Sequence, residues 1–195
     1  MSAGFKYNLQ PEDEKNERYD VKSGIRRIGP YKLDLASTPV GIELPSFTPV
    51  AADLRTKSCK PVRNVKVIEA YVSGSTSLKI QKGSLAYAGM FLGNGTKGTT
   101  VSYIDASNAG YDLLTVSGIG ADVSAGTVLF EATAADGATP KNVANSALYE
   151  RKKVDSGINL VALLSAAREI EPDKLVMPFS AKDKEKLGSD FQFNE

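Results

Sequence analysis

Residues 65–116 read VKVIEAYVSGSTSLKIQKGSLAYAGMFLGNGTKGTTVSYIDASNAGYDLLTV, and the same pattern continues as far as Asn142. Short apolar runs of strand length alternate here with turns rich in Gly, Asn and Asp. Runs of this length and spacing are typical of an all-β sandwich or a small barrel. We predict strands within six runs: Val65–Val72, Ser77–Gln81, Ser84–Leu92, Thr99–Ile104, Tyr111–Val116 and Gly126–Ala132.

The turn at Asn94-Gly95, inside LGNGTKG, has two interpretations. Asn and Gly both tolerate positive φ, which favours a tight hairpin. A Gly-rich loop could also bind phosphate. The segment lacks the G-x-x-x-x-G-K-[ST] spacing and no clear helix follows it, so we predict the hairpin.

The composition argues against several classes of function. Lys and Arg number 24 against 23 Asp and Glu, so no basic excess indicates a nucleic-acid partner. No apolar run approaches about 18 residues, so we expect no membrane partner. The chain has no His and one cysteine, Cys59, which removes the commonest general base and metal ligand. We therefore expect no enzyme activity, no cofactor and no metal.

Carboxylates are plentiful, so counting alone leaves a paired Asp/Glu hydrolase open. Several of them, however, fall at or near predicted turns, where Asp is common because it forms local hydrogen bonds. These turn carboxylates are Asp105, Asp112, Asp122, Glu131 and Asp136.

Residues 1–30 differ in composition from the rest of the chain, with few apolar residues and many charges of both signs. We interpret them as an extended arm that orders on a partner, and a plain unstructured terminus is the alternative. The apolar side chains that would anchor such an arm are Phe5, Tyr7, Tyr19 and Ile25.

Residues 31–63 are rich in proline, with Pro39, Pro45, Pro49 and Pro61. Because proline cannot donate to a sheet ladder, we expect extended or wrapping chain here and no central strands. Alternating apolar residues predict one short half-buried strand around 40–44.

The β-rich domain is predicted to span residues 64–179, and a short helix with a tail to span 180–195. Periodicity does not decide whether Ile158–Ile170 is strand or helix, and the all-β context favours strand. Ser180, Asp183 and Gly188 predict a capped helix with a glycine stop. The tail after it either packs back on the domain or frays. The overall expectation is an all-β sandwich or barrel with an N-terminal arm and a short C-terminal helix.

Four segments carry a resemblance to a known family: LPSFTPVAAD (44–53), VIEAYVSGSTSLKIQKGSLAYAGMFLGNGTKGTTV (67–101), AGTVLFEATAADGATPKNVANSALY (125–149) and EIEPDKLVMPFSAKDKEKL (169–187). Together they resemble the head-fibre and capsid-decoration proteins of phages and prophages of gut bacteria. The resemblance implies a β-rich structural module on the capsid exterior, made in the bacterial host cytoplasm. It also implies a homotrimer whose N-terminal part binds the major capsid protein.

The chain is short and has no repeated shaft or coiled-coil heptads, which favours a compact decoration or fibre-base module over a full fibre. A trimer would bury some apolar faces that look exposed in a single chain. The candidates for that interface are Tyr71, Tyr87, Met90 and Phe91, and ordinary core packing is the alternative for each.

A carbohydrate- or ligand-binding β-sandwich, such as a virion or cell-surface adhesin for a host glycan, is the second functional hypothesis. Sugar sites expose aromatic platforms, because a ring face packs on C–H groups. The chain has no Trp, and Tyr103 and Tyr111 are the best aromatic candidates near loops.

Overall fold

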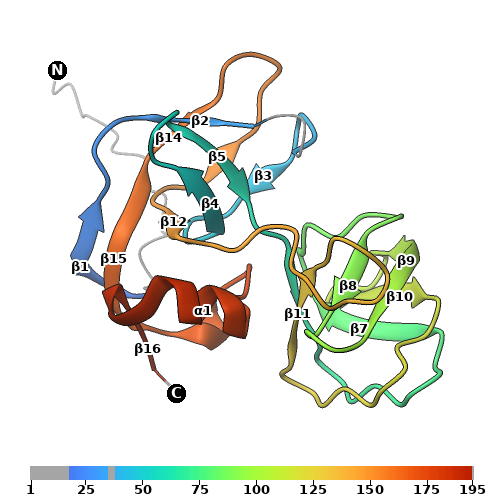
Figure 1. Ribbon diagram of the computed structural model, residues 1–195. Helices are drawn as coiled ribbons and strands as arrows, with labels where there is room; N and C mark the ends of the chain where they lie inside the picture. The colour runs from blue at the N-terminus through green and yellow to red at the C-terminus, as the bar shows by residue number, and fades with distance from the viewer. Residues whose placement is uncertain (1–17, 35–37, 195) are drawn as a thin grey trace, which may run out of the picture.

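The computed structural model describes residues 18–34 and 38–194. These residues form two β-lobes that lie side by side (Figure 1). The large lobe is assembled from both ends of the described chain, whereas the small lobe is one continuous segment in the middle. The chain therefore crosses between the lobes twice, after residue 61 and again between residues 131 and 146.

An eight-stranded sheet forms the large lobe, in the order β1-β15-β12-β4-β5-β2-β14, with β16 beside β15. A separate pair, β3 (Glu43–Leu44) and β13 (Lys152–Lys153), flanks it. Buried aromatic and aliphatic side chains fill the lobe in two clusters, one around Phe47 and one around Tyr31. The eight strands are β1 (Asp20–Arg26), β2 (Tyr31–Leu33), β4 (Pro49–Asp53), β5 (Ser58–Pro61), β12 (Ser146–Leu148), β14 (Leu160–Val161), β15 (Leu163–Ile170) and β16 (Phe191–Phe193).

The small lobe is a curled six-stranded sheet in the order β6-β11-β8-β9-β10-β7. Val67, directly after β6, bridges to Ile80 in β7, so the two edges of the sheet meet. Apolar side chains such as Leu78, Ile80 and Leu114 point inward and form its core. The strands are β6 (Asn64–Lys66), β7 (Ser77–Gln81), β8 (Phe91–Gly93), β9 (Gly98–Asp105), β10 (Tyr111–Val116) and β11 (Val128–Glu131).

The predicted all-β class with a short C-terminal helix is confirmed. Strands β7 and β10 have the predicted bounds, and the Asn94-Gly95 hairpin joins β8 to β9. Asn94 Oδ1 accepts hydrogen bonds from the backbone N–H of Thr96 and Lys97, which closes the turn. The prediction of a strand over Ser84–Leu92 is wrong for most of that length, because strand β8 begins only at Phe91.

The expectation of no central strand in the Pro-rich segment is also wrong. Strands β4 and β5 lie in the middle of the large sheet, between β12 and β2. Pro49 is the first residue of β4 and Pro61 the last of β5. At strand ends the missing N–H removes little pairing, so proline is tolerated there.

The ambiguous segment Ile158–Ile170 contains strands β14 and β15, as the all-β context favoured. The sequence analysis placed residues 146–179 in the same domain as residues 64–145. In the structure they belong to the large lobe, where β12 pairs with β4 and β15 pairs with β1. The tail packs back as β16, parallel to β15. Two 3₁₀ turns, η2 (Pro172–Lys174) and η3 (Gly188–Asp190), flank the helix.

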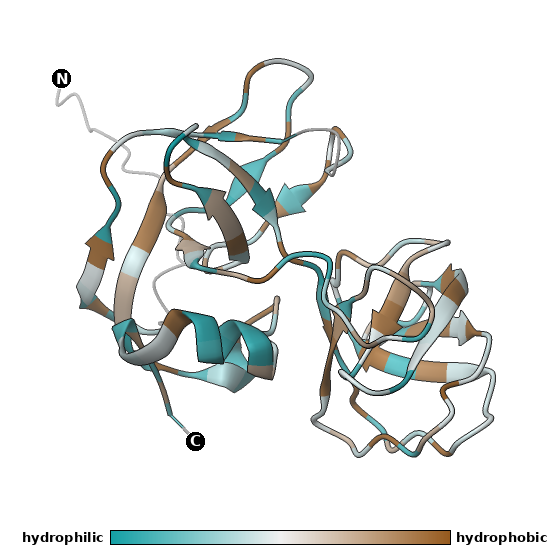
Figure 2. Ribbon diagram, in the orientation of Figure 1, coloured by the Kyte–Doolittle hydropathy of each residue, from teal (hydrophilic) through white to brown (hydrophobic). Residues whose placement is uncertain are grey.

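Helix α1 (Ala181–Leu187) has the predicted capping box. The Ser180 hydroxyl accepts from the Asp183 backbone N–H, and the Asp183 carboxylate accepts from the Ser180 N–H. Figure 2 shows α1 as mostly hydrophilic, in contrast to the hydrophobic β15. No helix in the described part of the chain is long and apolar enough to cross a membrane.

Candidate functional site

A cleft of about 800 Å³ lies between the two lobes, and we call it the inter-lobe cleft. The large lobe lines it with the loop before β3 and with Lys60 of β5, and the small lobe with the 83–87 segment that follows β7. Arg63 and Lys141, from the two crossings of the chain, complete the lining. Residues 84–87 of this segment belong to the run Ser84–Leu92 that was predicted as a strand, and they form no strand in the structure.

A buried carboxylate organises one end of the inter-lobe cleft. Glu131 on β11 accepts hydrogen bonds at Oε1 from the Tyr87 hydroxyl at 2.7 Å and from Lys141 Nζ at 2.8 Å. The guanidinium of Arg63 lies 3.8 Å from the same oxygen and 4.9 Å from the Tyr87 ring centroid. The hydrogen bond to Glu131 raises the pKa of Lys141 above its ordinary value. These contacts fix Tyr87 in position relative to both crossings of the chain.

The large-lobe wall of the cleft carries further polar side chains. Lys60 Nζ lies 3.4 Å from the Asp34 carboxylate, and Arg151 lies 3.8 Å from Glu43. Thr38 is 1% exposed, and its hydroxyl has no hydrogen-bond partner among the residues that the structure describes. A buried polar atom without a partner is uncommon and calls for an explanation.

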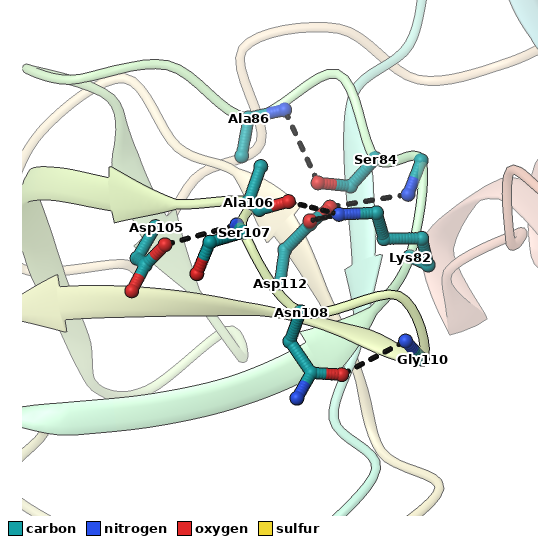
Figure 3. Close-up of polar contacts among 10 residues, drawn as sticks. Lys82, Ser84, Ala86, Asp105, Ala106, Ser107, Asn108, Gly110 and Asp112 are labelled. Carbon is teal, nitrogen blue, oxygen red and sulfur yellow. Dashed lines mark hydrogen bonds and ion pairs between the residues drawn. The ribbon is translucent and has the colours of Figure 1, made fainter.

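A second polar cluster positions the start of the 83–87 segment (Figure 3). The Lys82 ammonium donates to Asp112 Oδ1 at 2.8 Å and to the Ala106 carbonyl at 2.6 Å. Asp112 also accepts from the Gly83 N–H at 3.1 Å. Asp112 is buried, so this turn carboxylate serves the local structure of the lobe. A hydrogen bond from Ser107 lowers the pKa of the neighbouring Asp105.

The predicted anchor residues lie in different places. Phe5 and Tyr7 lie outside the described residues. Tyr19 packs on Phe47 with 4.8 Å between ring centroids, and burial raises its pKa. Ile25 lies on β1 with 60% of its surface exposed. Of the two anchor candidates that the structure describes, Ile25 is therefore the one available to a partner.

The residues predicted for a trimer interface also lie in different places. Tyr71 and Met90 belong to the core of the small lobe, so they offer almost no surface to another chain. Phe91 is partly buried, and Tyr87 is 38% exposed and lines the inter-lobe cleft.

The aromatic pair named for sugar binding lies away from the inter-lobe cleft. Tyr103 lies opposite Thr115 in the pairing of β9 with β10, and Tyr111 is four positions before Thr115 on β10. Because side chains alternate along a strand, both tyrosines lie on the outer face of the small lobe.

Several cleft residues were not singled out from the sequence, among them Thr38, Arg63 and Lys141. They come from three separate parts of the chain, and only the packing of the two lobes brings them together. Local motifs carry no signal for such a site.

A family model described as head fiber protein matches residues 1–192. The matched range contains both lobes and the whole inter-lobe cleft. No curated protein matches the chain, and no solved structure does.

Proposed function

Because the chain belongs to the head fiber protein family of bacteriophages and is a structural protein of the phage particle, we propose that it binds the outside of the capsid. Its role there is that of a decoration protein or the base module of a head fibre. Its partner is the major capsid protein, and it assembles onto the capsid after synthesis in the host cytoplasm. This role is structural and requires no catalysis.

One observation carries the proposal: the exposed apolar edge at the N-terminal side of the large lobe. Among the described strands, β1 is the last in its sheet, and Val21 and Ile25 on it are 55% and 60% exposed. Ile28, just after the strand, is 90% exposed. An edge strand offers unpaired backbone groups, and apolar side chains beside them favour contact with another protein.

We also propose that the protein is a homotrimer. Within the described part of the chain the large sheet ends at β1 on one side and at β14 on the other, and Leu160 on β14 is 52% exposed. A neighbouring copy of the chain can cover such a sheet edge and bury the apolar side chains on it. Three linked attachments would let each capsid contact be weak, because the second and third bind at an effective concentration of about millimolar.

The test is co-sedimentation with purified capsids, together with solution mass by light scattering. A chain lacking residues 1–17 keeps the described contacts, which begin where Arg18 donates to the Ser46 carbonyl. We expect the full chain to be a trimer that sediments with capsids. The truncated chain and the full-length variant Ile25→Ser should stay folded and remain in the supernatant.

Sedimentation unchanged in both variants would refute attachment through the N-terminal side. A monomer mass at micromolar concentration would refute the trimer in solution. Deleting residues 1–28 would not test attachment alone, because it also removes β1 from the sheet and Tyr19 from the core.

Carbohydrate binding, as in a virion or cell-surface adhesin for a host glycan, is the second candidate function. The observation that favours it is the inter-lobe cleft, where apolar side chains and convergent polar groups line one concavity. The two functions are compatible, because the exposed β1 edge and the cleft use different residues.

A further inference from the structure

We propose that the corner of the large lobe where β2 meets the β4–β5 turn binds an acidic surface of a partner protein. We call it the basic corner, and its residues are Ile28, Lys32, Asp53, Leu54, Arg55 and Lys57. The inference rests on the capsid attachment proposed above, in which the exposed edge that includes Ile28 meets the capsid. It adds the chemistry of the partner, because it requires clustered carboxylates on the capsid surface that this protein contacts.

The positive charge of the chain is concentrated in one stretch of sequence. Residues 18–63 contain nine of the 24 Lys and Arg residues but four of the 23 Asp and Glu residues. The near-neutral total of the chain therefore hides a local excess. Part of this excess is matched within the protein, since Lys60 lies 3.4 Å from Asp34 and Arg63 lies 3.8 Å from a carboxylate of the small lobe.

The fold brings three other cations of this stretch to the basic corner. The Lys32 N–H donates to the Lys57 carbonyl at 2.7 Å, which places β2 against the end of the β4–β5 turn. The Lys57 ammonium donates to the Ile28 carbonyl at 3.1 Å. Arg55 lies two positions earlier in the same turn, and all three cationic residues are exposed.

The cations of the basic corner have no carboxylate partner. Among the residues that the structure describes, none forms an ion pair with Lys32, Arg55 or Lys57. Asp53 is the carboxylate of the corner, and it accepts from the backbone N–H groups of Thr56 and Arg55. These hydrogen bonds, the one from Thr56 above all, lower the pKa of Asp53 and keep it ionised. The corner therefore holds three positive charges against one negative charge.

Lys57 is held in place although no carboxylate binds it. Its ammonium also donates to the Tyr31 hydroxyl at 3.2 Å and lies 4.9 Å from the Tyr31 ring centroid. An ammonium has three N–H donors, so one remains for a partner beside those given to Ile28 and Tyr31. Because the side chain is already ordered, binding a carboxylate there loses little side-chain entropy.

Exposed aliphatic side chains beside the cations favour a protein partner over a nucleic acid. Ile28 is 90% exposed and Leu54 is 48% exposed. Such side chains gain from burial against a protein surface, whereas the phosphates of a nucleic acid offer them no apolar contact. Ile28 also directly follows β1, so the basic corner adjoins the apolar edge proposed to meet the capsid.

The experiment is co-sedimentation of the full-length protein with purified capsids over a range of salt concentrations. We expect the affinity to fall roughly tenfold between about 50 mM and about 500 mM NaCl, because salt screens exposed charges. Lys32→Glu and Arg55→Glu should each weaken binding about fivefold at low salt and leave the melting temperature unchanged. The matched control is Lys97→Glu in the β8–β9 hairpin, which makes the same change of net charge and should bind like the wild type.

Zero-length crosslinking with a carbodiimide tests the chemistry of the partner directly. The reagent joins a lysine to a carboxylate where the two groups are in contact. Peptide mass spectrometry should find Lys32 or Lys57 joined to an Asp or Glu of the capsid. Lys66 lies 2.8 Å from Asp173 within the protein, so the crosslink between these two shows that the reagent has acted.

Four results would overturn the proposal, and they separate it from capsid attachment. Sedimentation unchanged by salt and by both basic-corner variants would refute the acidic partner and leave capsid attachment standing. No sedimentation at any salt concentration would refute capsid attachment and the basic corner together. An equal loss of binding in Lys97→Glu would assign the effect to net charge and not to this corner. Sedimentation abolished by nuclease treatment of the capsids would make the partner a nucleic acid.

Discussion

Cys59 is the single cysteine of the chain and is buried in the core of the large lobe. Burial, with a smaller contribution from Asp34, raises the pKa of its thiol from 9.0 to about 12. Between these two values the unfolded chain loses the thiol proton while the folded chain keeps it. The stabilisation is therefore complete below pH 9 and is lost as the pH rises toward 12.

This difference predicts a pH-dependent free energy of unfolding, measured by urea titration from pH 8 to pH 11. Wild type should lose about 1.4 kcal/mol per pH unit above pH 9 relative to Cys59→Ala, which has no thiol to titrate. The comparison cancels the contributions of tyrosines and lysines that titrate in the same range. Parallel stability curves for the two proteins would show that the Cys59 pKa is ordinary.

The carboxylate of Asp183 joins three separate segments through one buried side chain. It accepts from Ser180 at the helix start, from Asn64 Nδ2 at 2.7 Å and from the Ala144 N–H at 2.7 Å. Asp183→Ala would take this acceptor from the buried Asn64 and Ala144 donors and would remove the Asp183 half of the capping box, leaving the Ser180 N–H unpaired. We expect a loss of about 3 kcal/mol in unfolding free energy.

The control for Asp183 is Lys182→Ala, one position earlier on the exposed side of the same helix, which should cost less than about 0.5 kcal/mol. Equal losses in the two variants, measured by chemical denaturation, would contradict the role of Asp183. The capping box itself was predictable from the Ser180–Asp183 spacing. The contacts to Asn64 and Ala144 were not, because they join positions far apart in the sequence.

At the scale of elements, the loop after β11 lies directly on the β8–β9 hairpin. A Cβ atom added at Gly137 would lie 2.4 Å from the Gly98 Cα, and the Gly95 N–H donates to the Gly137 carbonyl. Gly137→Ala should therefore destabilise the small lobe by about 2–4 kcal/mol, from backbone overlap and from its φ of +69°.

Gly126→Ala separates the two causes in the Gly137 experiment. Gly126 also has a positive φ, +85°, but nothing lies within 4 Å of an added Cβ. It should lose only about 1 kcal/mol, the cost of backbone strain. Thermal unfolding of both variants measures the difference, and similar melting temperatures would mean that the loop yields without cost.

The success of the sequence prediction also varies by element. Strands β7 and β10 alternate apolar and polar residues between clear turns, so their bounds follow from local pattern. The segment 84–90 has apolar residues but no strand, because its residues 84–87 line the cleft and Met90 packs in the core. The central strands β4 and β5 were not predicted, because a proline inside a central strand would remove a ladder hydrogen bond. Pro49 and Pro61 instead lie at the ends of these strands. The pairing of β1 with β15 has no local signal at all.

At the scale of the whole molecule, the Glu131 cluster connects the small lobe to both crossings of the chain. Glu131→Gln keeps the size of the side chain and an acceptor for Tyr87, but leaves the buried Arg63 without its carboxylate. Unpairing a buried charge is costly, and we expect a loss of about 2–3 kcal/mol in unfolding free energy.

Lys141→Met is the companion variant for Glu131→Gln. It removes a half-exposed partner of the same carboxylate and should cost less than about 1 kcal/mol. Chemical denaturation monitored by tyrosine fluorescence would measure both. A greater loss in Lys141→Met than in Glu131→Gln would mean that the exposed lysine, not the buried arginine, is the partner that matters.

The split construction of the large lobe determines the order in which the chain can fold during synthesis. All strands of the small lobe lie within residues 64–131, so this lobe can complete itself early on the ribosome. Strand β1 must wait for β15, where Ser165 donates to the Ile25 carbonyl 140 positions earlier. The apolar edge proposed to meet the capsid is thus fixed in the sheet only after β15 has been synthesised. Such distant pairing is slow, and it delays a competent binding surface until late in synthesis.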